Sequence, residues 1–229
     1  MSSIVFDSGP IISLTTNNLL WILEKLREKY NGNFYISNAV REELIEKPLK
    51  IRRFKFEALQ VLDVIRRNIL QIYDNKELIN ETKYLLNLAN NCFIAKGNPI
   101  QIVHFAEMSG LAISILNETE AFVVDERNTR LLIEEPKKLL DILRKKLHTN
   151  VSLDSNKLRE FTNITKNIRL IRSVELVTVA YELGFLDRYV QNTPNLRKTL
   201  LEGLLWGVKL NGCSVSDKEI NQIIKIEGL

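Results

Sequence analysis

Four acidic residues of the chain stand where a short apolar run ends or where a helical stretch begins. Asp7 and Asp125 directly follow such runs, and Glu43 and Glu107 lie in helical stretches. If these positions meet at one edge of a sheet, their carboxylates repel one another unless a cation lies between them. Mg²⁺ and Mn²⁺ prefer oxygen ligands of this kind, and either ion activates water and neutralises charge on a phosphate group. The set therefore predicts a divalent metal site that acts on a phosphate ester.

The spacing of residues in a helix predicts on which face Glu107 lies. In a helix over residues 101–117, Glu107 lies on the same stripe as Val103 and Leu111. A carboxylate among apolar side chains is costly unless it is paired or holds a cation. The alternative is a capping or edge glutamate exposed at the helix end, and the sequence leaves both interpretations open.

Phase also separates two acids in the helix predicted over residues 39–46. Val40 and Leu44 define its inner face. Glu43 lies about 80° from the centre of that face, and Glu42 lies about 180° from it. We expect Glu43 to reach towards the sheet and Glu42 to point to water. The alternative for Glu43 is an ordinary solvated glutamate.

Strands and helices alternate along the first part of the chain. Strands are predicted at residues 3–7, 34–36, 70–73 and 121–124. Helices are predicted from Pro10 to residue 30 with a break at residues 17–18, and over residues 39–46, 50–68, 76–91, 101–117, 126–133 and 136–147, with a loop at residues 90–99. This alternation favours a three-layer α/β/α domain with a central parallel sheet over residues 1–136.

The pattern becomes mainly helical over residues 137–229. Two short strands are predicted there, at residues 151–153 and 168–171, with helices over residues 174–184, 195–210 and 217–228. This C-terminal segment either covers the sheet or forms a small appended domain.

Composition excludes several classes of protein. The 229 residues include only two cysteines and two histidines, without metal-ligand spacing, which argues against a zinc site or a disulfide scaffold. No apolar run is long enough to span a membrane and no signal peptide is evident, so a cytoplasmic protein is expected. The net charge of +4 is compatible with a nucleic-acid partner. The basic residues of the stretch 50–68 either contact phosphates or form a solvated face.

The four acids Asp7, Glu43, Glu107 and Asp125 stand in four sequence motifs, and these motifs together resemble those of the PIN domain family of Mg²⁺- or Mn²⁺-dependent ribonucleases. IVFDSGPIISL resembles the first strand of the family, with Asp7 followed by a small hydroxyl residue, Ser8. ISNAVREEL resembles the second motif, with Glu43 before a leucine. AEMSGLAISILNETEAFVVDE resembles the third and fourth motifs, with Glu107 and Asp125 18 residues apart. The resemblance covers residues 3–135.

The resemblance implies roles for these acids. Asp7 and Asp125 would be the main metal ligands, and Glu43 and Glu107 would complete the shell directly or through water. Because the fourth motif reads Asp-Glu, Glu126 is a further candidate for the last ligand.

Three other residues and the partners follow from the same resemblance. Ser8 would orient a ligand or a phosphate. Arg127 and Arg130 would contact phosphates, unless they simply lie on a helix surface. The implied reaction is hydrolysis of an RNA phosphodiester by a metal-activated water. The implied partners are RNA, an antitoxin or other protein as in toxin–antitoxin pairs, and a second copy in a homodimer.

Two rival interpretations remain. One is a PIN-like RNA-binding or scaffold protein without catalytic activity. The other is a different α/β fold, such as a receiver-like or phosphatase-like domain. A receiver would need an acidic pair at its first strand, where this chain has Asp7 alone.

Overall fold

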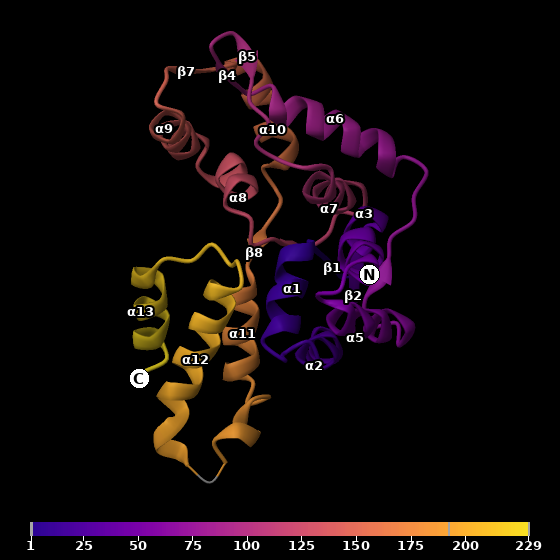
Figure 1. Cartoon of the computed structure of the whole chain (residues 1–229), viewed down its shortest axis with the longest axis vertical. Helices are drawn as coiled ribbons and strands as arrows, with labels where there is room; N and C mark the ends of the chain where they lie inside the picture. The colour runs from indigo at the N-terminus through magenta and orange to yellow at the C-terminus, as the bar shows by residue number, and fades with distance from the viewer. Residues whose placement is uncertain (1, 192, 229) are drawn as a thin grey trace.

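A five-stranded parallel sheet forms the centre of the computed structural model, which describes residues 2–191 and 193–228 (Figure 1). Its strand order is β3-β2-β1-β6-β8, and every neighbouring pair is parallel. The strands are β1 (Ser3–Phe6), β2 (Asn33–Ile36), β3 (Gln71–Ile72), β6 (Ala121–Val123) and β8 (Leu170–Ile171). The predicted α/β class with a central parallel sheet is confirmed.

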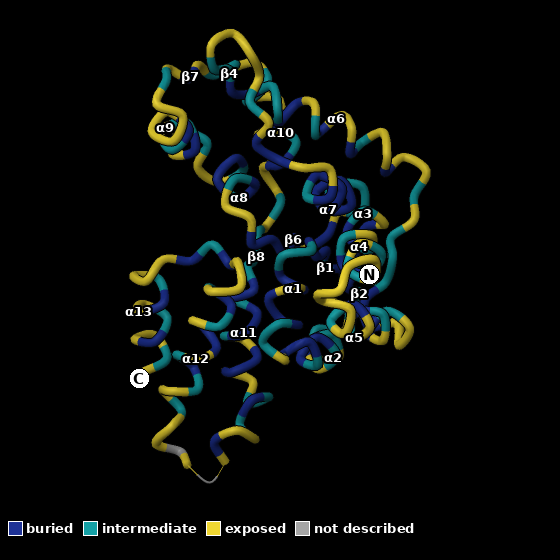
Figure 2. The backbone as a smooth tube through the Cα atoms, in the orientation of Figure 1, coloured by how far each residue is buried: buried dark blue, intermediate teal, exposed yellow. Residues whose placement is uncertain are grey.

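Both faces of this sheet are buried, because alternate strand residues enter two separate hydrophobic cores. Phe6 and Val123 belong to one core, and Val5 and Phe122 belong to the other. The first core is covered by α1 (Ser8–Thr16), α2 (Ile22–Tyr30), α5 (Lys55–Arg66), α11 (Ser173–Glu182), α12 (Arg197–Leu210) and α13 (Asp217–Ile226). The second is covered by α6 (Leu78–Asn90), α7 (Phe105–Leu116), α8 (Arg127–Glu134), α9 (Pro136–Leu147) and α10 (Ser155–Thr165). Figure 2 shows the dark, buried strands β1 and β6 between these helices.

The C-terminal part of the chain contributes to the same sheet and core. Strand β8 pairs with β6, and the N–H of Val124 donates to the carbonyl of Ile171 at 2.8 Å. Val177 of α11 and Leu205 of α12 are fully buried in the core that contains Phe6. Residues after 136 therefore supply both the fifth strand and a layer of helices over one face of the sheet. No helix within the described residues is long and apolar enough to cross a membrane.

The helix predicted over residues 39–46 is longer than expected. It runs as α3 (Asn38–Arg41), a π-helical turn (Glu42–Glu46) and α4 (Lys47–Lys50), so the predicted end before Pro48 is wrong. A regular α-helix would bring the Pro48 ring against the carbonyl four residues earlier, and the wider π turn relieves that contact. The next helix consequently begins at Lys55 and not at residue 50.

A second, antiparallel sheet was not predicted as such. It has the order β5-β4-β7, with β4 (Phe93–Ala95), β5 (Asn98–Pro99) and β7 (Val151–Leu153). The loop predicted at residues 90–99 is therefore a hairpin, with Lys96 at φ +50° and Gly97 at φ +81° in its turn. Helix α10 was also missed, although Asp154 caps it by accepting the N–H groups of Asn156 and Lys157, both at 3.1 Å.

Replacement of glycine by alanine is expected to have opposite effects on stability at two helical positions. A Cβ at Gly110 in α7 would lie 2.5 Å from the ring of Phe122, which is fully buried, whereas a Cβ at Gly203 in α12 would meet nothing within 4 Å. Gly110→Ala is expected to lower the free energy of unfolding by about 1–3 kcal/mol through overpacking. Gly203→Ala should raise it by up to about 1 kcal/mol, since alanine restricts the unfolded chain. Urea unfolding of both variants measures the difference; a stabilised Gly110→Ala variant would contradict the close α7–β6 contact.

A candidate carboxylate site at the edge of the sheet

The site forms where the strand order reverses. From β1 the chain proceeds outwards to β2 and β3, whereas β6 and β8 lie on the other side of β1. In open α/β sheets, ligands bind at the carboxyl ends of the strands at such a point. Asp7 follows β1, and its N–H donates to the carbonyl of Val123 in β6 at 2.9 Å. Asp125 follows β6, so these two acids leave neighbouring strands at the same edge.

A hollow of about 300 Å³ lies at this edge. Its lining includes six residues that were predicted from the sequence, namely Asp7, Ser8, Glu43, Glu107, Asp125 and Glu126. The structure therefore brings all four candidate carboxylates, Ser8 and Glu126 to one place. Arg127 and Arg130 line a neighbouring hollow instead.

Asp7 is the acid of this site whose carboxylate has the least favourable surroundings for a negative charge. Its side chain is buried, and its Oδ1 has no hydrogen-bond partner among the described residues. Burial, and then the nearby charge of Glu107, raise the pKa of Asp7 to about 7, against a smaller lowering by the backbone N–H groups of Ser8 and Gly9. A buried, unpaired carboxylate oxygen is costly, and a cation beside it would remove that cost.

Glu107 caps α7, as one of the two interpretations predicted, but it is half-buried and not exposed. Its Oε2 accepts the N–H of His104 at 3.4 Å and the hydroxyl of Thr129, so it caps α7. Burial, and then the charge of Glu126, raise the pKa of Glu107 to about 7. Neither of these hydrogen bonds uses Oε1, so one oxygen of Glu107 remains for a further partner.

Glu43, which was expected to reach towards the sheet, faces the start of α1 directly after β1. The hydroxyl of Ser8 donates to its Oε2 at 2.9 Å, and Lys47 lies 3.6 Å from its Oε1. Glu42 is exposed. The predicted distinction between these two neighbouring acids is confirmed. The hydrogen bond from Ser8 orients the Glu43 carboxylate towards α1.

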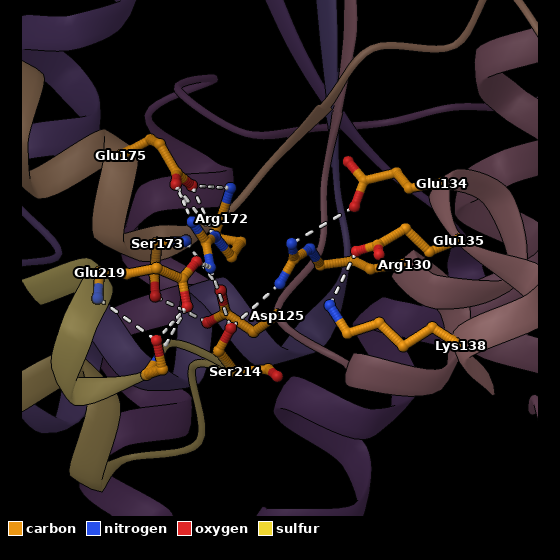
Figure 3. Close-up of polar contacts among 11 residues, drawn as sticks. Asp125, Arg130, Glu134, Glu135, Lys138, Arg172, Ser173, Glu175, Ser214 and Glu219 are labelled. Carbon is orange, nitrogen blue, oxygen red and sulfur yellow. Dashed lines mark hydrogen bonds and ion pairs between the residues drawn. The ribbon is translucent and has the colours of Figure 1, made fainter. Parts of the chain in front are cut away.

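Asp125 is held by protein groups on both oxygens (Figure 3). The N–H of Ser173 donates to Oδ1 at 2.8 Å, and the hydroxyls of Ser173 and Ser13 donate to Oδ2 at 2.7 and 3.2 Å. Asp125 therefore ties β6 to α1 and to the first turn of α11, so the structure gives it a role in holding these elements together. Neither serine was predicted as a partner of Asp125, because Ser173 is 48 residues away and Ser13 is 112 residues away in the chain.

The three remaining candidates lie around the start of α8. Glu126 is exposed and caps α8, because its Oε1 accepts the N–H of Asn128 at 3.3 Å. Arg130 donates to the carbonyl of Ser214 at 3.0 Å and contacts Glu134 at 3.3 Å, as Figure 3 shows. Arg130 thus joins α8 to the loop before α13. Arg127 is exposed, and no ion pair is formed by it in the described part of the chain.

The fit to a divalent ion rests on Asp7, Glu107 and Glu43. In residues 2–191 and 193–228, no group of three or more His, Cys, Asp or Glu side chains is arranged as a metal-binding cluster. The charges of Glu107 and Glu43 nevertheless raise the pKa of Asp7, so these carboxylates are electrostatically coupled. The Oδ1 of Asp7 and the Oε1 of Glu107, neither of which takes part in a hydrogen bond described for residues 2–191 and 193–228, are the kind of oxygen ligand that a divalent ion prefers. The residues present therefore fit such an ion.

Comparison with known proteins found no matching family model, no similar curated protein and no similar solved structure.

Proposed function

We propose that this chain is a Mg²⁺- or Mn²⁺-dependent ribonuclease with a PIN-like α/β/α fold. The observation that carries the proposal is the bare, buried Oδ1 of Asp7 beside Glu107 and Glu43, at the edge of the sheet where ligands bind. The order of the sequence motifs around Asp7, Glu43, Glu107 and Asp125 supports the same family.

Each acid has a defined part in this proposal. Asp7 and Glu107 would hold the ion, and Glu43, oriented by Ser8, would complete its shell directly or through water. When bound, the ion activates water and neutralises charge on the scissile phosphate. Asp125 positions the edge of β6 and the start of α11, and Glu126 lies beside Glu107 as an alternative ligand.

The second candidate is a PIN-like RNA-binding or scaffold protein without catalysis. One observation favours it: both oxygens of Asp125 already accept hydrogen bonds from serine groups. Metal binding discriminates the two, because a scaffold that has lost its chemistry would not need to hold the ion.

Two neighbouring glutamates provide the first test. Glu43→Gln is expected to slow Mn²⁺-dependent cleavage of single-stranded RNA by about 10- to 100-fold, because it removes a charge that supports the metal shell. Glu42→Gln, an exposed neighbour on the same helix, should cleave at the wild-type rate. Cleavage is measured with excess Mn²⁺ and again after addition of EDTA. Wild-type cleavage that survives EDTA, or equal rates for both variants, would contradict the proposed site. A wild type that neither binds Mn²⁺ in calorimetry nor cleaves would support the scaffold.

A further inference from the structure

A short segment next to the carboxylate site is both strongly basic and aromatic. Residues 47–56, here named the basic–aromatic segment, form α4 and the turn into α5. The segment contains five cationic residues and two phenylalanines, namely Lys47, Lys50, Arg52, Arg53, Lys55, Phe54 and Phe56. All seven are exposed, and Figure 2 shows the exposed chain between α4 and α5.

Most of these cations lack an anionic partner. Lys47 lies 3.6 Å from Glu43, and the guanidinium of Arg53 lies over the ring of Phe54 at 4.4 Å from its centroid. Within the described chain, Lys50, Arg52 and Lys55 form no ion pair. The segment therefore presents positive charge that the protein itself does not neutralise, and this favours a polyanionic partner.

The two rings are exposed where a ligand can reach them. Phe56 is 69% exposed and Phe54 is 37% exposed. Phe54 adopts φ +67°, a left-handed conformation that is unusual for a bulky side chain, and its carbonyl accepts the N–H of Ala58 at 3.0 Å. Strain of this kind persists only where the surrounding structure holds it, and it concentrates at binding sites. Exposed aromatic rings beside cations are the usual platform on which single-stranded nucleic acids stack their bases.

The segment also connects to the acids. Phe54 lines an apolar hollow together with Ile12, Ala58 and Glu43. Ile12 and Glu43 also line the hollow that contains Asp7 and Glu107. A single nucleic-acid strand that lies on Phe54 could therefore continue along the surface to the carboxylates.

We infer that the basic–aromatic segment binds single-stranded RNA, with bases stacked on Phe54 and Phe56 and phosphates paired with Lys50, Arg52 and Lys55. This inference rests on the proposed ribonuclease function, since it assigns the surface that delivers the strand to the site. The exposed Leu49, Ile51 and Leu59 nearby would instead suit a protein contact, such as a second copy of the chain. The positive charge favours RNA, because a contact between two copies of the chain would bring the cations of both copies together, where they repel one another.

Binding in EDTA tests the surface without cleavage. The probe is a fluorescently labelled oligouridylate, and its dissociation constant is measured by anisotropy over a range of salt concentrations. Phe54→Leu/Phe56→Leu keeps the apolar character but loses stacking, and we expect it to bind at least about tenfold more weakly. The single variant Phe56→Leu, at the more exposed ring, should show part of that loss and does not touch the strained backbone at Phe54.

The charges are tested through the salt dependence. Lys50→Ala/Arg52→Ala/Lys55→Ala should reduce the slope of log affinity against log salt by about 2, as expected for three lost phosphate contacts on a single strand. Lys145→Ala/Lys146→Ala removes two exposed cations at the end of α9, away from α5 in Figure 1, and should leave the slope unchanged. Equal slopes for the two sets would overturn the assignment.

The outcomes separate this inference from the ribonuclease proposal. A wild type that binds the oligonucleotide through Phe54 and Phe56 but cleaves no RNA with Mn²⁺ would refute the nuclease and retain the surface. Variants that bind and cleave as well as the wild type would retain the nuclease and overturn the surface. A concentration-dependent dimer in light scattering that dissociates on Leu49→Lys, without oligonucleotide binding by the wild type, would also overturn it in favour of a protein contact.

Discussion

Asp7→Asn is expected to abolish Mn²⁺-dependent RNA cleavage and, at the same time, to stabilise the metal-free protein. Asparagine has nearly the volume of aspartate, so the fold should be kept. The substitution removes the negative charge at a buried carboxylate oxygen that has no hydrogen-bond partner in the described structure. A charge that holds a metal ion contributes several kcal/mol to the reaction, so we expect a loss of at least about 100-fold in rate.

The stabilisation of the metal-free variant follows from the pKa of Asp7. Its ordinary value of 3.8 rises to about 7 in the folded protein, chiefly through burial. Between these two values the folded state binds the proton more readily than the unfolded state, so the free energy of unfolding falls as pH rises from about 4 to 7. For Asp7 alone the loss is about 4 kcal/mol at most. Glu107, whose pKa also rises to about 7, acts in the same direction.

Thermal unfolding in EDTA between pH 5 and pH 8 measures this effect. The wild type should be less stable at pH 8 than at pH 5, and Asp7→Asn should show a smaller decrease. The matched control is Asp74→Asn, because Asp74 also follows a strand of the same sheet but is exposed. Mn²⁺ should restore stability to the wild type at pH 8 and not to Asp7→Asn. Full cleavage activity in Asp7→Asn would contradict the assignment of Asp7 as a metal ligand.

Asp125→Ala is expected to cause the largest loss of stability of the substitutions considered, about 3–5 kcal/mol. It would leave the buried N–H of Ser173 and the hydroxyls of Ser173 and Ser13 without their shared acceptor. Hydrogen bonds to a charged group are each worth about 1.5–3 kcal/mol, and an unpaired buried donor adds its own cost. The lost contacts join β6 to α1 and α11, so the loss should affect the whole fold and not one loop.

Two further variants separate the charge from the hydrogen bonds. Asp125→Asn keeps one acceptor oxygen for the N–H of Ser173, so it should destabilise less than Asp125→Ala. Ser173→Ala loses only the hydroxyl contact at 2.7 Å and should cost about 1–2 kcal/mol. Urea unfolding gives the three values, and Glu126→Gln, at the exposed neighbouring acid, serves as control. If Asp125→Ala unfolds at the same urea concentration as the wild type, the hydrogen bonds of Asp125 do not stabilise the fold as described.

The same variants decide what Asp125 does in catalysis. Both of its oxygens accept hydrogen bonds from serine donors, whereas Asp7 has a bare oxygen. We therefore expect Asp125→Asn to retain more cleavage activity than Asp7→Asn. Equal losses would place Asp125 in the metal shell despite its serine partners.

The sequence by itself was sufficient to predict features that depend on near neighbours in the chain. The apolar runs before Asp7 and Asp125 are strands, and the break near residue 17 separates α1 from α2. The phase of Glu43 relative to Val40 and Leu44 also predicted which side of the helix it faces. These predictions succeed because hydrophobic periodicity and helix-ending residues act within a few positions of one another.

Only the tertiary structure decided the features that need distant partners. Strand β8 joins the sheet although it lies after residue 136, and the hairpin β4–β5 is paired with β7 from a remote part of the chain. The serine donors of Asp125 and the bare oxygen of Asp7 likewise depend on which segments pack together. The acids at the sheet edge were therefore predictable as residues, whereas their different environments were not. Burial, hydrogen bonding and neighbouring charge are set by packing between segments that the local pattern does not relate.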